Sequence, residues 1–183
     1  MTMEATEAVK RLLREIGEDP ERDGLLETPA RVVKALQEMT VGYGMDPAEI
    51  LSKRFECSYD SLIVLRRVQF TSLCEHHLLP FSGYATVAYL PRDCVVGISK
   101  LARLTECFAR RLQIQERITE QIAGALNREL KPLGVGVVLQ ARHSCMMCRG
   151  VKQMESEMIT STMFGALRDN AAARAELLTL AMG

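Results

Sequence analysis

The spacing of apolar side chains predicts two helices at the start of the chain. Between Met3 and Ile16 the apolar residues fall three and four positions apart, which is the period of one helix face. A second helix is expected to begin at Thr28-Pro29 and to run toward Gly42, because proline is favoured at the first helical position. Asp46-Pro47 predicts a third, shorter helix that begins in the same way.

The hydrophobic period then changes from that of a helix to that of a strand. Leu62–Phe70 and Tyr84–Leu90 are rich in β-branched, apolar and aromatic residues, and they predict two strands. The helical period returns twice afterwards. Ser99 is expected to cap the first of these helices, and Pro132 and Gly134 are expected to end the second.

Two further strands are expected at Val135–Ala141 and Val151–Ile159, and Asn170 is expected to cap a last helix. The order strand-strand-helix-helix-strand-strand favours an antiparallel sheet with a helix pair on one face, an α+β fold. We therefore expect an N-terminal helical region over residues 1–55 and one compact unit over residues 56–183.

Composition and charge narrow the possible functions. The chain has 183 residues, with 48% apolar and 25% charged, which is the balance of a globular domain. Its formal net charge is zero, so no global positive field would recruit nucleic acid or an anionic membrane surface. No segment approaches eighteen consecutive apolar residues and no secretory signal is recognisable, so we expect a cytoplasmic protein without a membrane partner.

The histidines and two of the cysteines are clustered. All three histidines fall in Cys74-Glu75-His76-His77 and His143-Ser144-Cys145. Thiolate sulfur and imidazole nitrogen are preferred zinc ligands, and a catalytic zinc keeps three protein ligands and one open position. Cys74 and His77 are close enough in sequence to bind one ion from a turn, and Cys145 could complete the set.

The remaining cysteines carry weaker signals. A disulfide framework is not expected in a chain without a secretory signal. Cys57, Cys94 and Cys107 are expected to behave as small hydrophobic residues, because no other ligand type surrounds them. Cys148 follows Cys145 at metal-like spacing, and the sequence leaves open whether it is a ligand or a spectator.

A second group of candidate residues is basic. Ser99, Lys100 and Arg103 lie within one helical turn, and Arg149 follows the second metal segment. A solvated charged face is the plainer alternative, but a helix N-terminus beside two cations is also a seat for an anion. The chain has no GxxxxGK[ST] loop, so side chains would have to hold a nucleotide triphosphate. Gln115-Glu116 lies where one helical run meets the next.

Four motifs together resemble the GTP cyclohydrolase I family. They follow one another in order and with similar spacing, within a resemblance that extends from about Thr28 to Leu180. The motifs are Cys74-Glu75-His76-His77-Leu78-Leu79-Pro80-Phe81, Gly97-Ile98-Ser99-Lys100-Leu101-Ala102-Arg103, Arg111-Leu112-Gln113-Ile114-Gln115-Glu116-Arg117, and His143-Ser144-Cys145-Met146 with Arg149-Gly150.

The resemblance implies a fold and an assembly. Each subunit would have the tunnelling fold, a four-stranded antiparallel sheet backed by two helices. Subunits would form a toroidal homodecamer of two pentamers, with active sites at the subunit interfaces.

The resemblance also implies roles for individual residues. Cys74, His77 and Cys145 would hold one zinc ion per subunit, although similar sites accept iron(II) or manganese(II). His76, His143 and Ser99 would be catalytic, and the triphosphate and ribose would be contacted by Ser99, Lys100, Arg103 and Arg149. Gln115 and Glu116 would recognise guanine. Arg31 and Lys34 would bind phosphate from a neighbouring subunit.

The implied reaction is zinc-dependent hydrolysis of GTP at guanine C8 with release of formate. Rearrangement and ring closure would then give 7,8-dihydroneopterin triphosphate, the first step of folate and tetrahydropterin biosynthesis. His143 would protonate the ring nitrogen as the imidazole opens, since histidine titrates near working pH. The Glu116 carboxylate would accept from N1–H and the 2-amino group of guanine, both of which adenine lacks.

Three positions depart from the family pattern, and they keep two alternatives open. Ser82 and Tyr84 stand where phenylalanine and lysine are expected, and Cys148 where cysteine is unusual. One alternative is a catalytically inactive zinc-binding homologue in which Cys148 also coordinates. Another is a different pterin enzyme of the tunnelling fold. The catalytic residue types disfavour the first alternative, and the Cys-Glu-His-His segment fits the second poorly.

Overall fold

A computed structural model of the chain describes residues 3–182, and these form two compact units, residues 3–41 and 42–182. The first unit contains α1 (Met3–Glu15), the 3-10 helix η1 (Asp23–Leu25) and α2 (Thr28–Met39). The helices predicted from Met3 and from Thr28-Pro29 are thus confirmed.

The second unit begins before the position expected from the sequence. The 3-10 helix η2 (Val41–Gly44) spans the boundary and is followed by α3 (Pro47–Ile50), whose cap residue Asp46 accepts a hydrogen bond from the Ala48 N–H at 2.9 Å. Leu51 is fully buried in the core of the larger unit. Packing therefore groups residues 42–55 with the sheet, whereas the sequence had suggested a division after residue 55.

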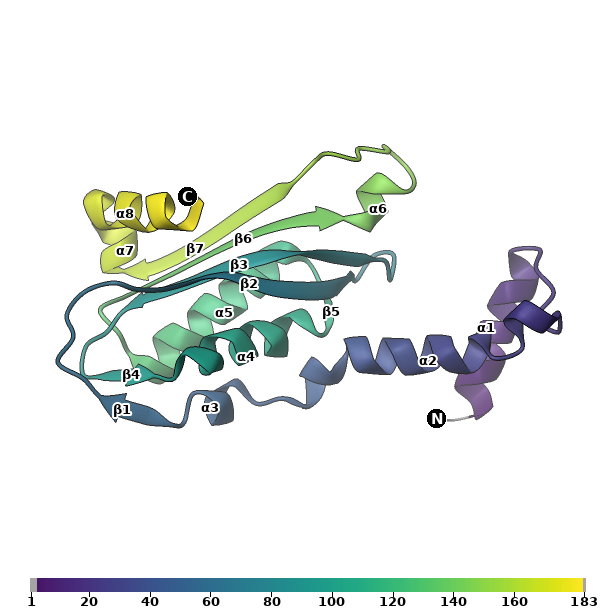
Figure 1. Cartoon of the computed structure of the whole chain (residues 1–183), viewed down its shortest axis with the longest axis horizontal. Helices are drawn as coiled ribbons and strands as arrows, with labels where there is room; N and C mark the ends of the chain where they lie inside the picture. Colours follow the sequence, from purple (N-terminus) through teal and green to yellow (C-terminus); the bar gives the residue numbers. More distant parts are fainter. Residues whose placement is uncertain (1–2, 183) are drawn as a thin grey trace. The chain divides into compact units, whose positions relative to one another are not determined.

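The larger unit is built on a five-stranded sheet in the order β5-β2-β3-β6-β7 (Figure 1). Four strands are antiparallel, and the fifth, β5, adds a two-residue parallel pairing to β2, so the four-stranded prediction was incomplete. The strands are β2 (Ile63–Cys74), β3 (Pro80–Leu90), β5 (Leu112–Gln113), β6 (Gly134–His143) and β7 (Met158–Gly165), and a separate pair joins β1 (Arg54–Glu56) to β4 (Cys94–Val96).

One predicted strand was displaced. The expected strand at Val151–Ile159 is a loop as far as residue 157, and β7 starts at Met158. The side chains of Val151 and Met154 are 64% and 56% exposed, so they do not pack against the sheet.

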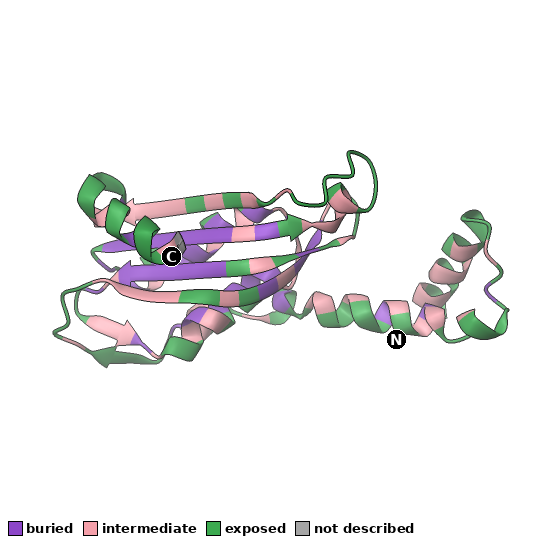
Figure 2. Ribbon diagram, turned by 45° about the horizontal axis from the view of Figure 1, so that its top comes forward, coloured by how far each residue is buried: buried purple, intermediate pink, exposed green. Residues whose placement is uncertain are grey.

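Two helices cover one face of the sheet, as expected. They are α4 (Ile98–Ala109) and α5 (Gln115–Leu130), and their apolar faces share one core with the inward side chains of β3 and β6. Figure 2 shows the buried residues concentrated in the central strands. Gly97, not Ser99, is the N-cap of α4, so the predicted cap was wrong by two residues; Ser99 is instead the second residue of the helix.

The C-terminal helices pack on the opposite face. Along β3, Val87 and Tyr89 belong to the main core, whereas Ala88 belongs to a smaller cluster with Leu167 and Leu177. This alternation follows from the two-residue period of a strand. Leu167 comes from α7 (Ala166–Asp169) and Leu177 from α8 (Ala171–Met182). Asn170 caps α8 as predicted, because its side-chain oxygen accepts a hydrogen bond from the Ala172 N–H at 2.9 Å.

None of the helices within residues 3–182 combines the length and the apolar character needed to cross a membrane.

Candidate metal centre and active site

The turn between β2 and β3 places Cys74 and His77 on one small loop. Backbone hydrogen bonds close it: the Cys74 N–H donates to the Leu79 carbonyl at 2.9 Å, and the Leu78 N–H donates to the Cys74 carbonyl at 2.9 Å. Leu78 adopts a left-handed conformation, with φ of 55°, that turns the chain back into β3. The ligand spacing of the motif is therefore fixed by backbone geometry.

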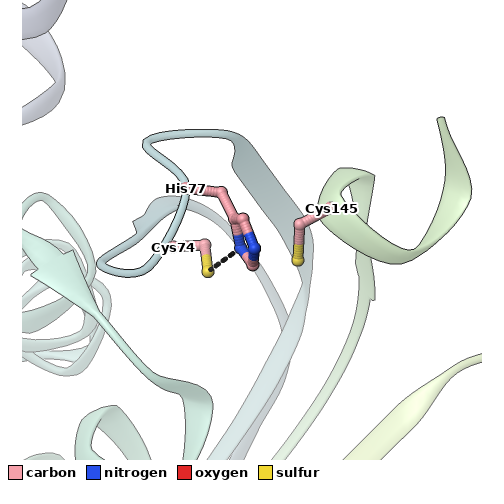
Figure 3. A group of neighbouring side chains, drawn as sticks. All are labelled: Cys74, His77 and Cys145. Atoms are coloured by element: carbon pink, nitrogen blue, oxygen red, sulfur yellow. Dashed lines mark hydrogen bonds between the residues drawn. The ribbon is translucent and has the colours of Figure 1, made fainter. Parts of the chain in front are cut away.

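Strand register brings Cys145 to the same place from the far side of the sequence. Phe81 at the start of β3 lies opposite His143 at the end of β6, so the short helix α6 (Ser144–Met147) starts beside the turn. Figure 3 shows Cys74, His77 and Cys145 directed toward one another from the turn and from α6.

The geometry of these three side chains fits a tetrahedral metal site. Their ligand atoms all lie within 4.8 Å of one another, and the Cys74 Sγ and His77 Nδ1 atoms are 3.6 Å apart. Tetrahedral zinc, with Zn–S of about 2.3 Å and Zn–N of about 2.0–2.1 Å, separates a sulfur and a nitrogen ligand by roughly 3.5 Å. The family-implied ligand set is therefore brought together by the fold, and it could hold a metal ion.

The electrostatics of the thiols support the same interpretation. Burial, followed by the nearby Cys74 thiol, raises the pKa of the Cys145 thiol. Two neighbouring thiolates repel one another unless a cation lies between them, and a divalent ion would offset both effects.

His143 lies partly buried beside this group. Its ring stacks on that of Phe81, with centroids 4.4 Å apart and planes at 10°. Burial lowers its pKa, and the charge of Glu116 acts in the opposite direction. The net effect favours a neutral imidazole near pH 7, able to accept a proton.

His76 and Glu75 occupy the turn between the two ligands. His76 is exposed, and its Nδ1 atom is 3.8 Å from the Cys74 Sγ atom. Glu75 pairs with Arg117 of α5, and hydrogen bonds from this arginine lower the pKa of the Glu75 carboxyl. Neither Glu75 nor Arg117 was singled out from the sequence, although both lie in the quoted motifs.

Gln115 and Glu116 form the first turn of α5. Glu116 is exposed, whereas Gln115 is only 1% exposed and its Nε2 atom donates to the Leu139 carbonyl at 3.1 Å and the Met158 carbonyl at 3.0 Å. The Gln115 Oε1 atom is buried and has no hydrogen-bond partner among residues 3–182.

The basic candidates of the larger unit fall in two places, one on α4 and one next to the metal group. Ser99 and Lys100 are in the first turn of α4, and Arg103 lies near the middle of the helix. Figure 1 shows α4 beginning near β4 and ending near β5, on the side of the metal turn. Arg149 is exposed after α6, with its Nη1 atom 3.5 Å from the Cys145 carbonyl oxygen.

Two further basic candidates lie in the smaller unit. Arg31 and Lys34 are exposed on α2, where they pair with Glu27 and Glu38 respectively.

The remaining departures from the family pattern sit outside the metal group. Cys148 is exposed, its thiol donates to the Ser144 carbonyl at 2.9 Å, and its sulfur is not among the three clustered ligand atoms. Ser82 and Tyr84 are both exposed on β3, where the Tyr84 ring lies under the Arg67 guanidinium at 5.1 Å.

Comparison with known proteins gives a consistent result over nearly the whole chain. The family model for GTP cyclohydrolase I matches residues 5–182. The GTP cyclohydrolase 1 of Nitrosospira multiformis is 53% identical over 94% of this chain and 91% of its own length. Those of Rickettsia africae and Chlorobium phaeovibrioides are 52% and 50% identical, covering 97% and 96% of this chain and 94% and 79% of their own.

Among solved structures, the archaeosine synthase QueF-Like in the apo form aligns with a TM-score of 0.48 and 18% identity, over 57% of this chain and 94% of its own. A likeness of this size says nothing about the chemistry of the site.

Proposed function

Because this chain belongs to the GTP cyclohydrolase I family, we propose that its Cys74, His77 and Cys145 hold one zinc ion where GTP reacts. The chain is a GTP cyclohydrolase, the enzyme that opens the imidazole ring of guanine. The observation that carries the zinc proposal is the convergence of two sulfurs and one imidazole nitrogen within 4.8 Å. Zinc with three protein ligands lowers the pKa of water toward neutrality, and this supplies the nucleophile for guanine C8.

We assign the proton transfers to the histidines. His143 is held neutral by its partial burial, so it can accept the proton released by the attacking water. It then returns this proton to the ring nitrogen as the C8–N bond breaks. Exposed His76, in the same turn as Cys74 and His77, would serve the second hydrolysis, which releases C8 as formate.

Recognition of guanine is assigned to the first turn of α5. The exposed Glu116 carboxylate would accept from N1–H and the 2-amino group, and its charge already acts on His143. Gln115 is assigned to the same turn, where its buried Oε1 atom has no hydrogen-bond partner in the part of the chain that the structure describes. A site of this kind rejects bases that lack the matching donors by roughly 10⁴-fold.

Binding of the triphosphate is assigned to Ser99, Lys100, Arg103 and Arg149, with Arg31 and Lys34 from a neighbouring copy. Ser99 and Lys100 lie in the first turn of α4, and the N-terminal end of a helix attracts anions. In Figure 1 this turn is at the end of α4 next to β4, away from the turn between β2 and β3. We therefore propose that each active site is shared, with the phosphate-binding turn of one copy facing the metal of another.

The sheet has the edges that such an assembly needs. Among the described residues, β2 pairs with β5 only at Leu73 and Cys74, and β7 is the last strand on the other side. Joining the outer edge of β7 to the open edge of β2 in the next copy would repeat around a closed ring. We propose a tunnelling fold assembled in this way into two pentameric rings, and sedimentation or native mass spectrometry would test the decamer.

Product analysis with and without a chelator tests the catalytic proposal. Purified protein is incubated with GTP, and formate and the fluorescent oxidised pterin are both quantified. We expect equal amounts of the two products, loss of both after chelation, and recovery when zinc is returned. Parallel recovery with iron(II) and manganese(II) compares the metals. Product formation that resists complete metal removal would refute the zinc site.

A further inference from the structure

The Glu75–Arg117 ion pair joins the metal-binding turn to the helix that carries Glu116. Glu75 lies between Cys74 and His77 in sequence, and its carboxylate receives two hydrogen bonds from one guanidinium, including Arg117 Nη2 to Oε1 at 3.1 Å. The partners are 42 residues apart in sequence. Paired N–H donors on a planar fork fix direction as well as distance, which a lone charge does not.

A second set of bonds closes the connection through β5. The Glu75 N–H donates to the Gln113 carbonyl at 3.1 Å, and Arg117 Nη1 donates to Gln113 Oε1 at 3.3 Å. Cys74 itself pairs with Gln113 in the parallel ladder. Because β5 has only two residues, this ladder is too short to hold the turn by itself, and the ion pair braces the same junction.

We propose that Glu75 and Arg117 are positioning residues that hold the metal-binding turn in register with the guanine-reading turn of α5. The inference rests on the proposed roles of the three metal ligands and of Glu116. Both side chains are partly exposed, at 30% and 41%, so the pair adds little to folding stability. Its consequence lies in geometry, because a displacement of about 1 Å at a reacting centre can cost roughly 10²-fold in rate.

Three variants test the proposal: Glu75→Gln, Arg117→Gln and the double variant. Each single change should lower kcat/KM for GTP by roughly 10- to 100-fold while zinc stays near one per chain. The double variant should be no worse than either single one, because one shared contact is lost. Arg117→Lys should recover only part of the activity, since lysine lacks the planar fork.

Selectivity for GTP over inosine triphosphate is a second measurement, and a general loss of protein stability would not change it. Inosine triphosphate lacks the 2-amino group that Glu116 is proposed to bind. A misplaced Glu116 should therefore discriminate less, and the ratio of the ITP inhibition constant to the GTP KM should fall several-fold in both single variants. Arg128→Gln is the matched control, because Arg128 is an exposed arginine in the last turn of the same helix.

Failure of the proposed function and failure of the positioning role give different results. If the parent protein shows no chelator-sensitive formate release, the proposed function fails first. If the parent is active and the variants match it in rate and selectivity, the positioning role alone is refuted. Loss in Glu75→Gln with a normal Arg117→Gln would also overturn it, because the carboxylate would then act without its partner.

Discussion

A single methyl group at Gly83 should disturb both the stability and the activity of this enzyme. Gly83 lies in β3 and pairs with Ala141 of β6. A Cβ atom built there would sit 1.8 Å from the Gln140 carbonyl oxygen and 2.7 Å from the Ala141 Cα atom, whereas ordinary contact begins at 3.4 Å. The obstructing atoms belong to the backbone, so no side-chain rotation can relieve the overlap.

The size of the effect follows from the movement required. The strands must separate by roughly 1 Å or more, and overpacking of this kind costs about 3 kcal/mol when backbone has to shift. The Phe81–His143 pair lies two residues along the same ladder, between the two metal-ligand segments. A displacement there should also lower kcat/KM by about 10²-fold.

Urea denaturation and formate release measure the two effects. Both are recorded at one protein concentration, because association contributes to apparent stability. Gly124→Ala is the matched control: it lies inside α5, and a Cβ there meets nothing within 4 Å. We expect that control to gain about 0.5–1 kcal/mol, since glycine weakens a helix interior. A Gly83→Ala protein with parental stability and activity would refute the argument from strand spacing.

Three further predictions concern the site itself. Cys145→Ser should lose both bound zinc and activity, whereas Cys148→Ser should retain both by metal analysis and turnover; the reverse pattern would transfer the ligand role to Cys148. Glu116→Ala should keep its zinc but lose GTP turnover, and normal turnover would discredit the guanine assignment. Burial lowers the pKa of His143 below 6.5, so neutral imidazole persists into mildly acidic solution. The acid limb of kcat/KM should therefore have a midpoint below 6.5, and a midpoint well above it would contradict His143 as the proton acceptor.

Local sequence patterns were sufficient for most of the secondary structure. Proline after Thr28 and after Asp46 has a fixed φ that suits a first helical turn, and the Asn170 side chain accepts hydrogen bonds from the first turn of α8. These helix starts can therefore be predicted from neighbouring residues. The strand predicted at 151–159 was wrong over most of its length, because its apolar residues Val151 and Met154 are exposed and do not pack on a sheet. Strand β7 begins only at Met158, where pairing with β6 begins.

For the metal group, the contributions of sequence and fold can be stated separately. Residue types and family motifs identified Cys74, His77 and Cys145, and the fold brings these three together. Gln115 was expected to contact guanine. Its near-complete burial and its hydrogen bonds to β6 and β7 could not be predicted, because the polar residues around it in the sequence suggest an exposed position.

The sequence by itself determined the side chains to which we assign the chemistry, because sulfur, imidazole and carboxylate are properties of residue type. It also indicated where α2, α3 and α8 begin, since the residues that mark these starts act locally. Only the tertiary structure decided that Phe81 lies opposite His143, that Glu75 reaches Arg117, and that Gly83 admits no side chain. These are contacts between segments far apart in the chain, and strand register, which no local pattern specifies, sets their distances.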